Sequence, residues 1–164
     1  MELFEFLKQL SSEVYVFIIS MFPIVELRGA IPVGSLLGIN PIICYLIAVF
    51  GNILPIPFIL IFIKRILEYM SKSKIKLFNN VANKLIERAD KRSDKLNKGT
   101  FYGLFIFVAI PLPGTGAWTG ALIASLLGIR FKKSMLAIFC GVLLAGLIMT
   151  LGSYGIVSAF KIFA

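Results

Sequence analysis

Histidine is absent from this sequence of 164 residues, and acidic residues are scarce, with eight Asp and Glu against 17 Lys and Arg. No nucleophile stands beside a base, and no paired carboxylates are visible, so we expect neither an enzyme nor catalytic residues. The only two cysteines, Cys44 and Cys140, lie inside apolar segments. There they are expected to be packing residues, and we expect no metal site and no cofactor.

Apolar residues, by contrast, are abundant and make up 59% of the chain. An average soluble domain contains about 45 to 50%. Uncharged stretches cover residues 14–25, 39–63, 101–129 and 135–160. Three of these exceed the length of about 20 residues that a helix needs to cross the hydrocarbon of a bilayer. The sequence therefore predicts an all-α integral membrane protein.

Positive charge is concentrated in residues 64–98, which contain eleven basic and four acidic residues, a net charge of +7. A basic loop between apolar segments is expected in the cytoplasm, with anionic lipid headgroups rather than nucleic acid as its partner. Apolar residues recur within it at steps of three and four, which predicts an amphipathic helix on the inner membrane surface. A solvated linker helix between two halves is the alternative.

The two apolar halves resemble one another at an offset of 90 residues. The segment Ser-Leu-Leu-Gly-Ile occurs at residues 35–39 and again at residues 125–129. The same offset aligns Pro23 with Pro113, Leu46 with Leu136, Gly51 with Gly141 and Leu54 with Leu144. We therefore expect an internal duplication, with a first repeat at about 14–63, a basic segment at 64–99 and a second repeat at about 101–151, in a single membrane domain of residues 1–164.

Charge predicts that the two repeats are inverted. Arg130, Lys132 and Lys133 follow the second copy of the repeated segment and are expected to stay in the cytoplasm, whereas no charge follows the first copy. Gly38 and the C-terminus are then expected outside. Inverted repeats are a recurrent plan of secondary transporters, which hold their site at the repeat interface near the midplane.

The segment 101–129 lies between two cytoplasmic charge clusters, so a single crossing cannot accommodate it. Proline and glycine at residues 111–116 are suited to a turn at its middle. Each limb has about 12 to 14 residues and reaches roughly 20 Å into a core about 30 Å thick. We therefore predict a re-entrant helical hairpin here, and a matching one at residues 14–37 with its turn around residues 23–32. That a single helix spans the membrane at residues 14–37 is the alternative.

A transmembrane helix is expected after each hairpin. The first runs over residues 42–63 and is bent by Pro55 and Pro57. The second starts near Lys133 and runs to about Leu151, after which Gly152 and Gly155 are expected to break it.

Glu26 and Arg28 are the only charges deep inside the first predicted hairpin, and such residues in a membrane are functional by default. A carboxylate at Glu26 could exchange a proton during transport, whereas the guanidinium of Arg28 is suited to phosphate or carboxylate. Alternatively, the two side chains only neutralise one another or cap broken helix ends. On a regular helix they do not face each other, so a direct pair would require an unwound turn.

The second predicted hairpin offers backbone amides at its glycines and hydroxyls at its threonines, and the start of a half-helix directs a positive dipole end at the same place. Trp118 is either a packing aromatic or a wall of the substrate pathway. The candidate substrate and proton-coupling residues are Glu26, Arg28, Gly29, Pro32, Pro111, Pro113, Gly114, Thr115, Gly116, Trp118 and Thr119.

Residues 26–32, ELRGAIP, together with residues 111–120, PLPGTGAWTG, resemble the bacterial and archaeal family of putative small multidrug export proteins. That family is distantly similar to the DedA superfamily, which has two opposed re-entrant hairpins and includes translocases of polyprenyl-phosphate driven by the proton gradient. The resemblance implies a multi-pass protein of the prokaryotic plasma (inner) membrane, with Glu26 and Arg28 matching the functional residues of the first hairpin. DedA proteins also carry arginines in the second hairpin, where this chain has none.

The leading hypothesis is a small transporter or lipid flippase, coupled to the proton gradient, with its site between the two opposed hairpins. Its cargo would be a small amphiphile, either a lipophilic cation or a polyprenyl-phosphate or other lipid. A membrane scaffold or assembly factor that does not transport is the alternative. A homodimer is possible for a chain of this size.

Overall fold

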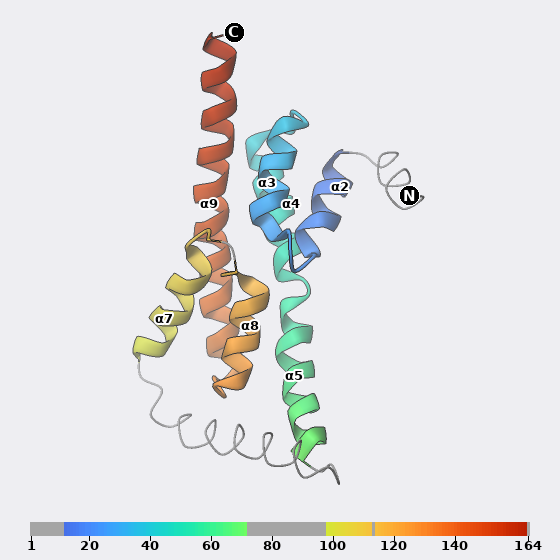
Figure 1. Ribbon diagram of the computed structural model, residues 1–164, viewed down its shortest axis with the longest axis vertical. Helices are drawn as coiled ribbons and strands as arrows, with labels where there is room; N and C mark the ends of the chain where they lie inside the picture. The colour runs from blue at the N-terminus through green and yellow to red at the C-terminus, as the bar shows by residue number, and fades with distance from the viewer. Residues whose placement is uncertain (1–11, 72–97, 113, 164) are drawn as a thin grey trace. The chain divides into compact units, whose positions relative to one another are not determined.

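The computed structural model describes residues 12–71, 98–112 and 114–163, and helices are the only regular structure in them (Figure 1). The chain divides into two compact units. Unit 1 comprises Met1–Pro55 and Val142–Ala164, and unit 2 comprises Ile56–Gly141. Most of the predicted amphipathic helix and Pro113 lie outside the described residues. The single membrane domain stays a prediction.

Unit 1 contains α2 (Ser12–Met21), α3 (Glu26–Leu36) and α4 (Pro41–Ile53), together with the end of α9 (Phe131–Phe163). The chain reverses between α2 and α3, which pack on each other and on α4 (Figure 1). The hydroxyls of Tyr45 and Tyr154 donate to the carbonyls of Leu143 and Ile39, at 3.2 and 2.8 Å, and tie α9 to the rest of the unit. The buried core is apolar and includes Val16, Leu27, Ala30, Ile31, Cys44, Ala48 and Val142.

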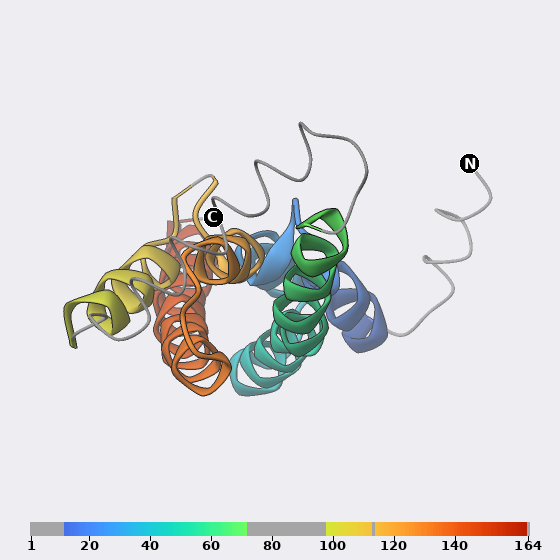
Figure 2. The same cartoon turned by 90° about the horizontal axis from the view of Figure 1, so that it is seen from below.

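Unit 2 contains α5 (Ile56–Ser71), α7 (Lys98–Ala109), α8 (Ala117–Leu126) and the start of α9. The chain leaves α7 through the loop of residues 110–116 and enters α8, which packs on α7 and on α5 (Figures 1 and 2). Close approach depends on glycine. A Cβ at Gly120 would lie 2.7 Å from the side chain of Val108, and one at Gly141 would lie 3.0 Å from the carbonyl oxygen of Phe105.

The two halves share their local structure at the 90-residue offset. α3 and α8 end at glycines in the left-handed region, with φ of 74° at Gly38 and 67° at Gly128. The amide of Gly38 donates to Ser35 and that of Gly128 to Ser125, at 3.2 and 3.1 Å. Such backbone bonds close the C-terminus of a helix, and glycine adopts this conformation without steric cost. This agreement is local, and the inverted arrangement of the repeats and the re-entrant placement of the hairpins stay predictions.

Within the described residues, two apolar helical stretches are long enough to cross a bilayer, Pro41–Ile63 with 23 residues and Phe131–Ile156 with 26. The first is interrupted at residues 54–55, where α4 ends and α5 begins, because Pro55 has no N–H to continue the helix. Pro55 thus interrupts the first crossing where the sequence predicted a bend, whereas Pro57 lies inside α5, which continues to Ser71.

Two expectations were wrong. Gly152 and Gly155 do not break α9, which continues to Phe163. A helical glycine costs only about 1 kcal/mol relative to alanine, which a long helix tolerates. The first turn is also shorter than expected, because it occupies residues 22–25 and α3 already contains Gly29 and Pro32.

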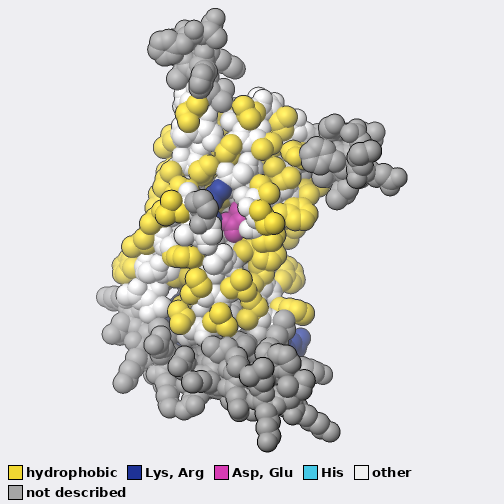
Figure 3. All heavy atoms as spheres, in the orientation of Figure 1, with side chains coloured by type: hydrophobic (Ala, Val, Ile, Leu, Met, Phe, Trp, Pro, Cys, Tyr) yellow, Lys and Arg dark blue, Asp and Glu magenta, His cyan; other side chains and the backbone are white. Residues whose placement is uncertain are grey.

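The exposed surface is apolar as well as the core. Large side chains on the outer faces of the two long stretches are well exposed, among them Phe50 at 70% and Leu151 at 68%. Hydrophobic side chains cover much of the described part of the face in Figure 3. A helix that is apolar on both its buried and its exposed faces is typical of a membrane span, because lipid replaces water as the solvent.

Candidate functional site

The first turn places Glu26 in an unusual backbone conformation. Glu26 begins α3 with φ of 50°, the only positive φ of a non-glycine residue in the described part of the chain. A bulky L-residue with positive φ is rare, and its conformational strain is about 1 to 3 kcal/mol. Its amide nevertheless donates to the Phe22 carbonyl at 2.9 Å, so the backbone of the turn is well defined.

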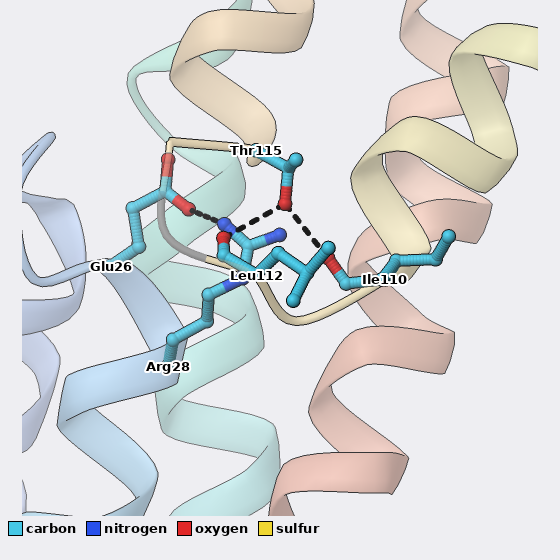
Figure 4. A network of polar contacts seen from close by, with 5 residues as sticks. All are labelled: Glu26, Arg28, Ile110, Leu112 and Thr115. Atoms are coloured by element: carbon cyan, nitrogen blue, oxygen red, sulfur yellow. Dashed lines mark hydrogen bonds and ion pairs between the residues drawn. The ribbon is translucent and has the colours of Figure 1, made fainter.

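That conformation brings two charges together although they lie only two residues apart. Nη1 of Arg28 donates to Oε2 of Glu26 at 2.9 Å (Figure 4). The Glu26 side chain is 6% exposed and that of Arg28 is 16% exposed. Side chains at i and i+2 diverge on a regular helix. The direct pair therefore depends on the non-helical φ of Glu26. The sequence analysis predicted that such a pair would require an unwound turn.

Gly29 and Pro32 support this turn from inside α3. A Cβ at Gly29 would lie 2.5 Å from the side chain of Val25, so glycine lets the turn close on the first coil of the helix. Pro32 has no N–H to donate to the carbonyl of Arg28, which lies one turn before it. The carbonyl of Pro32 in turn accepts a hydrogen bond of 2.8 Å from the buried hydroxyl of Ser35.

The second turn lies in unit 2 and is held by a threonine. Oγ1 of Thr115 lies 2.8 Å from the carbonyl oxygen of Ile110 and 2.9 Å from that of Leu112, and its hydroxyl donates between them (Figure 4). Gly114 has φ of 81°, a conformation that favours glycine. Pro111 is half-buried, and Pro113 lies outside the described residues. The hydroxyl of Thr115 thus satisfies carbonyls that the break in the helix leaves available.

α8 begins immediately after this turn. Gly116 is its N-cap and provides no side-chain hydrogen bond, so the first amides of α8 follow an extended glycine. Gly116 is buried, whereas Trp118 and Thr119 are half-buried. The half-helix therefore starts at Ala117, close to Thr115 as the sequence predicted.

The structure thus brings together the candidate residues within each turn. Glu26, Arg28, Gly29 and Pro32 gather at the start of α3, and the described candidates among residues 111–119 gather around the start of α8. That the two groups meet stays a prediction, because they belong to different units. Among the described residues, no three His, Cys, Asp or Glu side chains form a group that could hold a metal ion.

Sequence reasoning missed the buried polar residues Ser20, Ser134 and Asn52, which are 0, 0 and 1% exposed. Ser20 donates to the carbonyl of Phe17 in its own helix, and Ser134 donates to the carbonyls of Ile129 and Arg130, which directly precede α9. Asn52 differs, because none of the described residues pairs with its amide. An asparagine in an apolar run three residues before Pro55 was the available signal.

Long apolar helices and apolar outer faces define an α-helical membrane protein. Comparison with known families agrees and is more specific. The chain belongs to the family described as putative small multi-drug export protein, whose sequence model matches residues 26–148. The match begins at Glu26. No curated protein and no solved structure matches the chain. The family description is that of an exporter and not of an enzyme.

Proposed function

We propose that this chain exports small amphiphilic cations across the membrane in exchange for protons. The carboxylate of Glu26 would bind the cation and the proton in turn. The observation that supports this most directly is the ion pair of Glu26 with Arg28, held at 2.9 Å within an apolar unit. The family description as a multi-drug exporter agrees with such a cargo.

Fold stability does not account for a glutamate at this position. Glycine or asparagine would adopt positive φ with less strain. A buried salt bridge is also weak evidence for stability, because the cost of removing both charges from water offsets much of their attraction. Strain that a structure maintains at one charged residue is a reason to expect function there.

The pair also supplies the chemistry that exchange requires. A proton and a cationic cargo both bind the same carboxylate, so the two exclude one another. When the proton neutralises Glu26, the permanent charge of Arg28 remains beside it and repels the cation, which favours release. When the proton leaves, the carboxylate attracts either Arg28 or the next cation. Mutual exclusion at one site is the condition for coupling cargo to the proton gradient.

Binding of tetraphenylphosphonium, a lipophilic cation, to the purified protein tests this proposal. Glu26→Gln should weaken binding by roughly 10- to 100-fold, equivalent to about 1 to 3 kcal/mol for a charged interaction. It should also remove the pH dependence of transport in proteoliposomes. Glu26→Asp should retain part of both, and Arg28→Gln should leave binding intact or tighten it.

Two controls separate charge from folding. Glu26→Asn tolerates positive φ and lacks the charge, so it should fold well and still bind poorly. The double variant Glu26→Gln with Arg28→Gln removes both charges and leaves no lone buried ion. Unchanged binding and unchanged pH dependence in Glu26→Gln would refute the proposal.

A polyprenyl phosphate as cargo predicts the opposite pattern, because the guanidinium of Arg28 would then hold the phosphate through two parallel hydrogen bonds. Binding of a short-chain polyprenyl phosphate would fall in Arg28→Lys and fall further in Arg28→Gln. If neither the cation nor the phosphate responds to either substitution, a membrane scaffold becomes the better account of the chain.

A further inference from the structure

Asn52 lies near the end of α4, in the middle of the apolar stretch Pro41–Ile63. The residue is 1% exposed, and neither Oδ1 nor Nδ2 of its amide has a hydrogen-bond partner in the described part of the chain. Burying an amide without partners costs about 1 to 3 kcal/mol for each unsatisfied group. Native structures rarely accept that cost, so each such group requires an explanation.

The helices around Asn52 pack closely on two sides. On one side, Gly51 meets α2 so closely that a Cβ there would lie 2.7 Å from the carbonyl oxygen of Phe17. On another side, Tyr45 and Val49 share a helical face with Asn52 and pack against Gly146 of α9. A side chain from a second copy of the protein cannot reach an amide that is buried in this way.

The chemistry of the amide restricts its ligand further. A metal cation would satisfy Oδ1 and would be repelled by the N–H groups of Nδ2, and an anion would do the reverse. A hydroxyl group both donates and accepts, and it satisfies both atoms in turn. The smallest such ligand is water.

The break after α4 begins two residues after Asn52. Pro55 has no N–H, so it cannot donate to a carbonyl of the preceding turn as a residue of a regular helix would. Asn52 itself offers one acceptor, Oδ1, and one donor group, Nδ2, on the last turn before this break. Buried waters typically make two to four hydrogen bonds, commonly to such groups and at kinks in helices.

We propose that Asn52 anchors a water site inside unit 1 that exchanges with the aqueous phase, and so makes the break between α4 and α5 a hydrated point within the membrane. The proposal does not depend on the exported cargo. The second half of the chain provides a matched control, because Val142 stands at the equivalent position and is fully buried.

Thiol labelling tests whether water reaches this point, because methanethiosulfonates react with thiolates, which form only where water enters. The protein is first freed of its own thiols by Cys44→Ser, which copies the equivalent Ser134, and by Cys140→Ala. Asn52→Cys and Val142→Cys are then compared in proteoliposomes with 2-aminoethyl methanethiosulfonate. Asn52→Cys should react roughly tenfold faster than Val142→Cys or more. Water at position 52 would raise the fraction of the thiol that is deprotonated and would give the reagent a path to it. Equal rates would overturn the proposal.

The sign of a stability change gives a second test that needs no thiol. If Asn52 holds a water molecule, Asn52→Val removes its hydrogen bonds and lowers the thermal unfolding midpoint, and Asn52→Ser should recover part of the loss because its hydroxyl still binds water. If the amide is buried dry, Asn52→Val removes an unsatisfied group and raises the midpoint. A higher midpoint in Asn52→Val would therefore overturn the proposal even if the labelled variants failed to fold.

Discussion

The two turns of this protein occupy equivalent places in the repeated sequence and contain different chemistry. The first turn presents an ion pair between Glu26 and Arg28. At the same offset the second turn has Gly116 and Trp118, and its polar contacts come from the hydroxyl of Thr115. The flanking helices end in the same way, with left-handed glycines at Gly38 and Gly128. A shared local scaffold therefore supports two different sets of side chains.

This difference separates the structural features that both halves share from the charged residues that only the first half contains. Helix ends and close helix contacts depend on backbone geometry, so glycines recur at the same offset in both halves. Charge occurs at only one of the two turns, so the proposed exchange of protons and cations depends on the first half. Substitutions at equivalent positions can separate these two kinds of residue.

The largest effect is expected at the glycines of the close helix contacts. Gly51→Ala and Gly141→Ala should each destabilise the purified protein by about 1 to 3 kcal/mol, because the added methyl group overpacks a contact with a backbone carbonyl. Thermal unfolding in detergent measures the effect. Gly103→Ala is the control, since a Cβ there meets nothing within 4 Å. If Gly51→Ala behaves like this control, the halves do not share this contact.

A smaller and equal effect is expected at the helix ends. Gly38→Ala and Gly128→Ala should each cost about 1 to 2 kcal/mol, the price of a left-handed conformation for an L-residue. At Gly38 the cost is in the backbone alone, because a Cβ there has no neighbour within 4 Å. Asparagine should cost less than alanine at both positions, since it tolerates positive φ. Unequal losses measured by the same unfolding experiment would contradict the equivalence of the two ends.

The smallest effect is expected at the second turn. Thr115→Val should cost about 0.5 to 1.5 kcal/mol, because it removes a hydroxyl that donates to the carbonyls of Ile110 and Leu112. Thr115→Ser keeps the hydroxyl and should remain close to the original stability. Transport of tetraphenylphosphonium should change much less in Thr115→Val than in Glu26→Gln. A comparable loss of transport in both variants would show that the second turn takes part in cargo exchange.

Much of the local structure was predictable from the sequence. Proline marks both turns, with glycine also in the second, and Pro55 marks the break between α4 and α5. The extent of the first turn was not predictable, because Gly29 and Pro32 favour an irregular backbone in isolation and yet lie inside α3. The continuation of α9 through Gly152 and Gly155 likewise contradicts the local preference of glycine.

Among the site residues, Glu26 and Arg28 could be identified from the sequence, because a charged residue within an apolar stretch stands out without knowledge of the backbone conformation. Their direct contact could not, because it depends on φ at Glu26, which the surrounding turn imposes. Asn52 was missed for a related reason. An asparagine is ordinary in a sequence, and only its burial without a partner makes it notable.

The sequence alone determined that this is a helical, apolar chain with a basic central segment and repeated breaks, because composition and periodicity fix how much surface needs lipid and where a helix lacks an N–H donor. The tertiary structure decided which breaks persist, which charges touch and which polar groups lose access to solvent. The contact of the two charges depends on φ at Glu26 in the turn. The burial of polar groups depends on contacts between residues far apart in the chain, as between Tyr154 and Ile39 or Gly51 and Phe17, which no local pattern encodes.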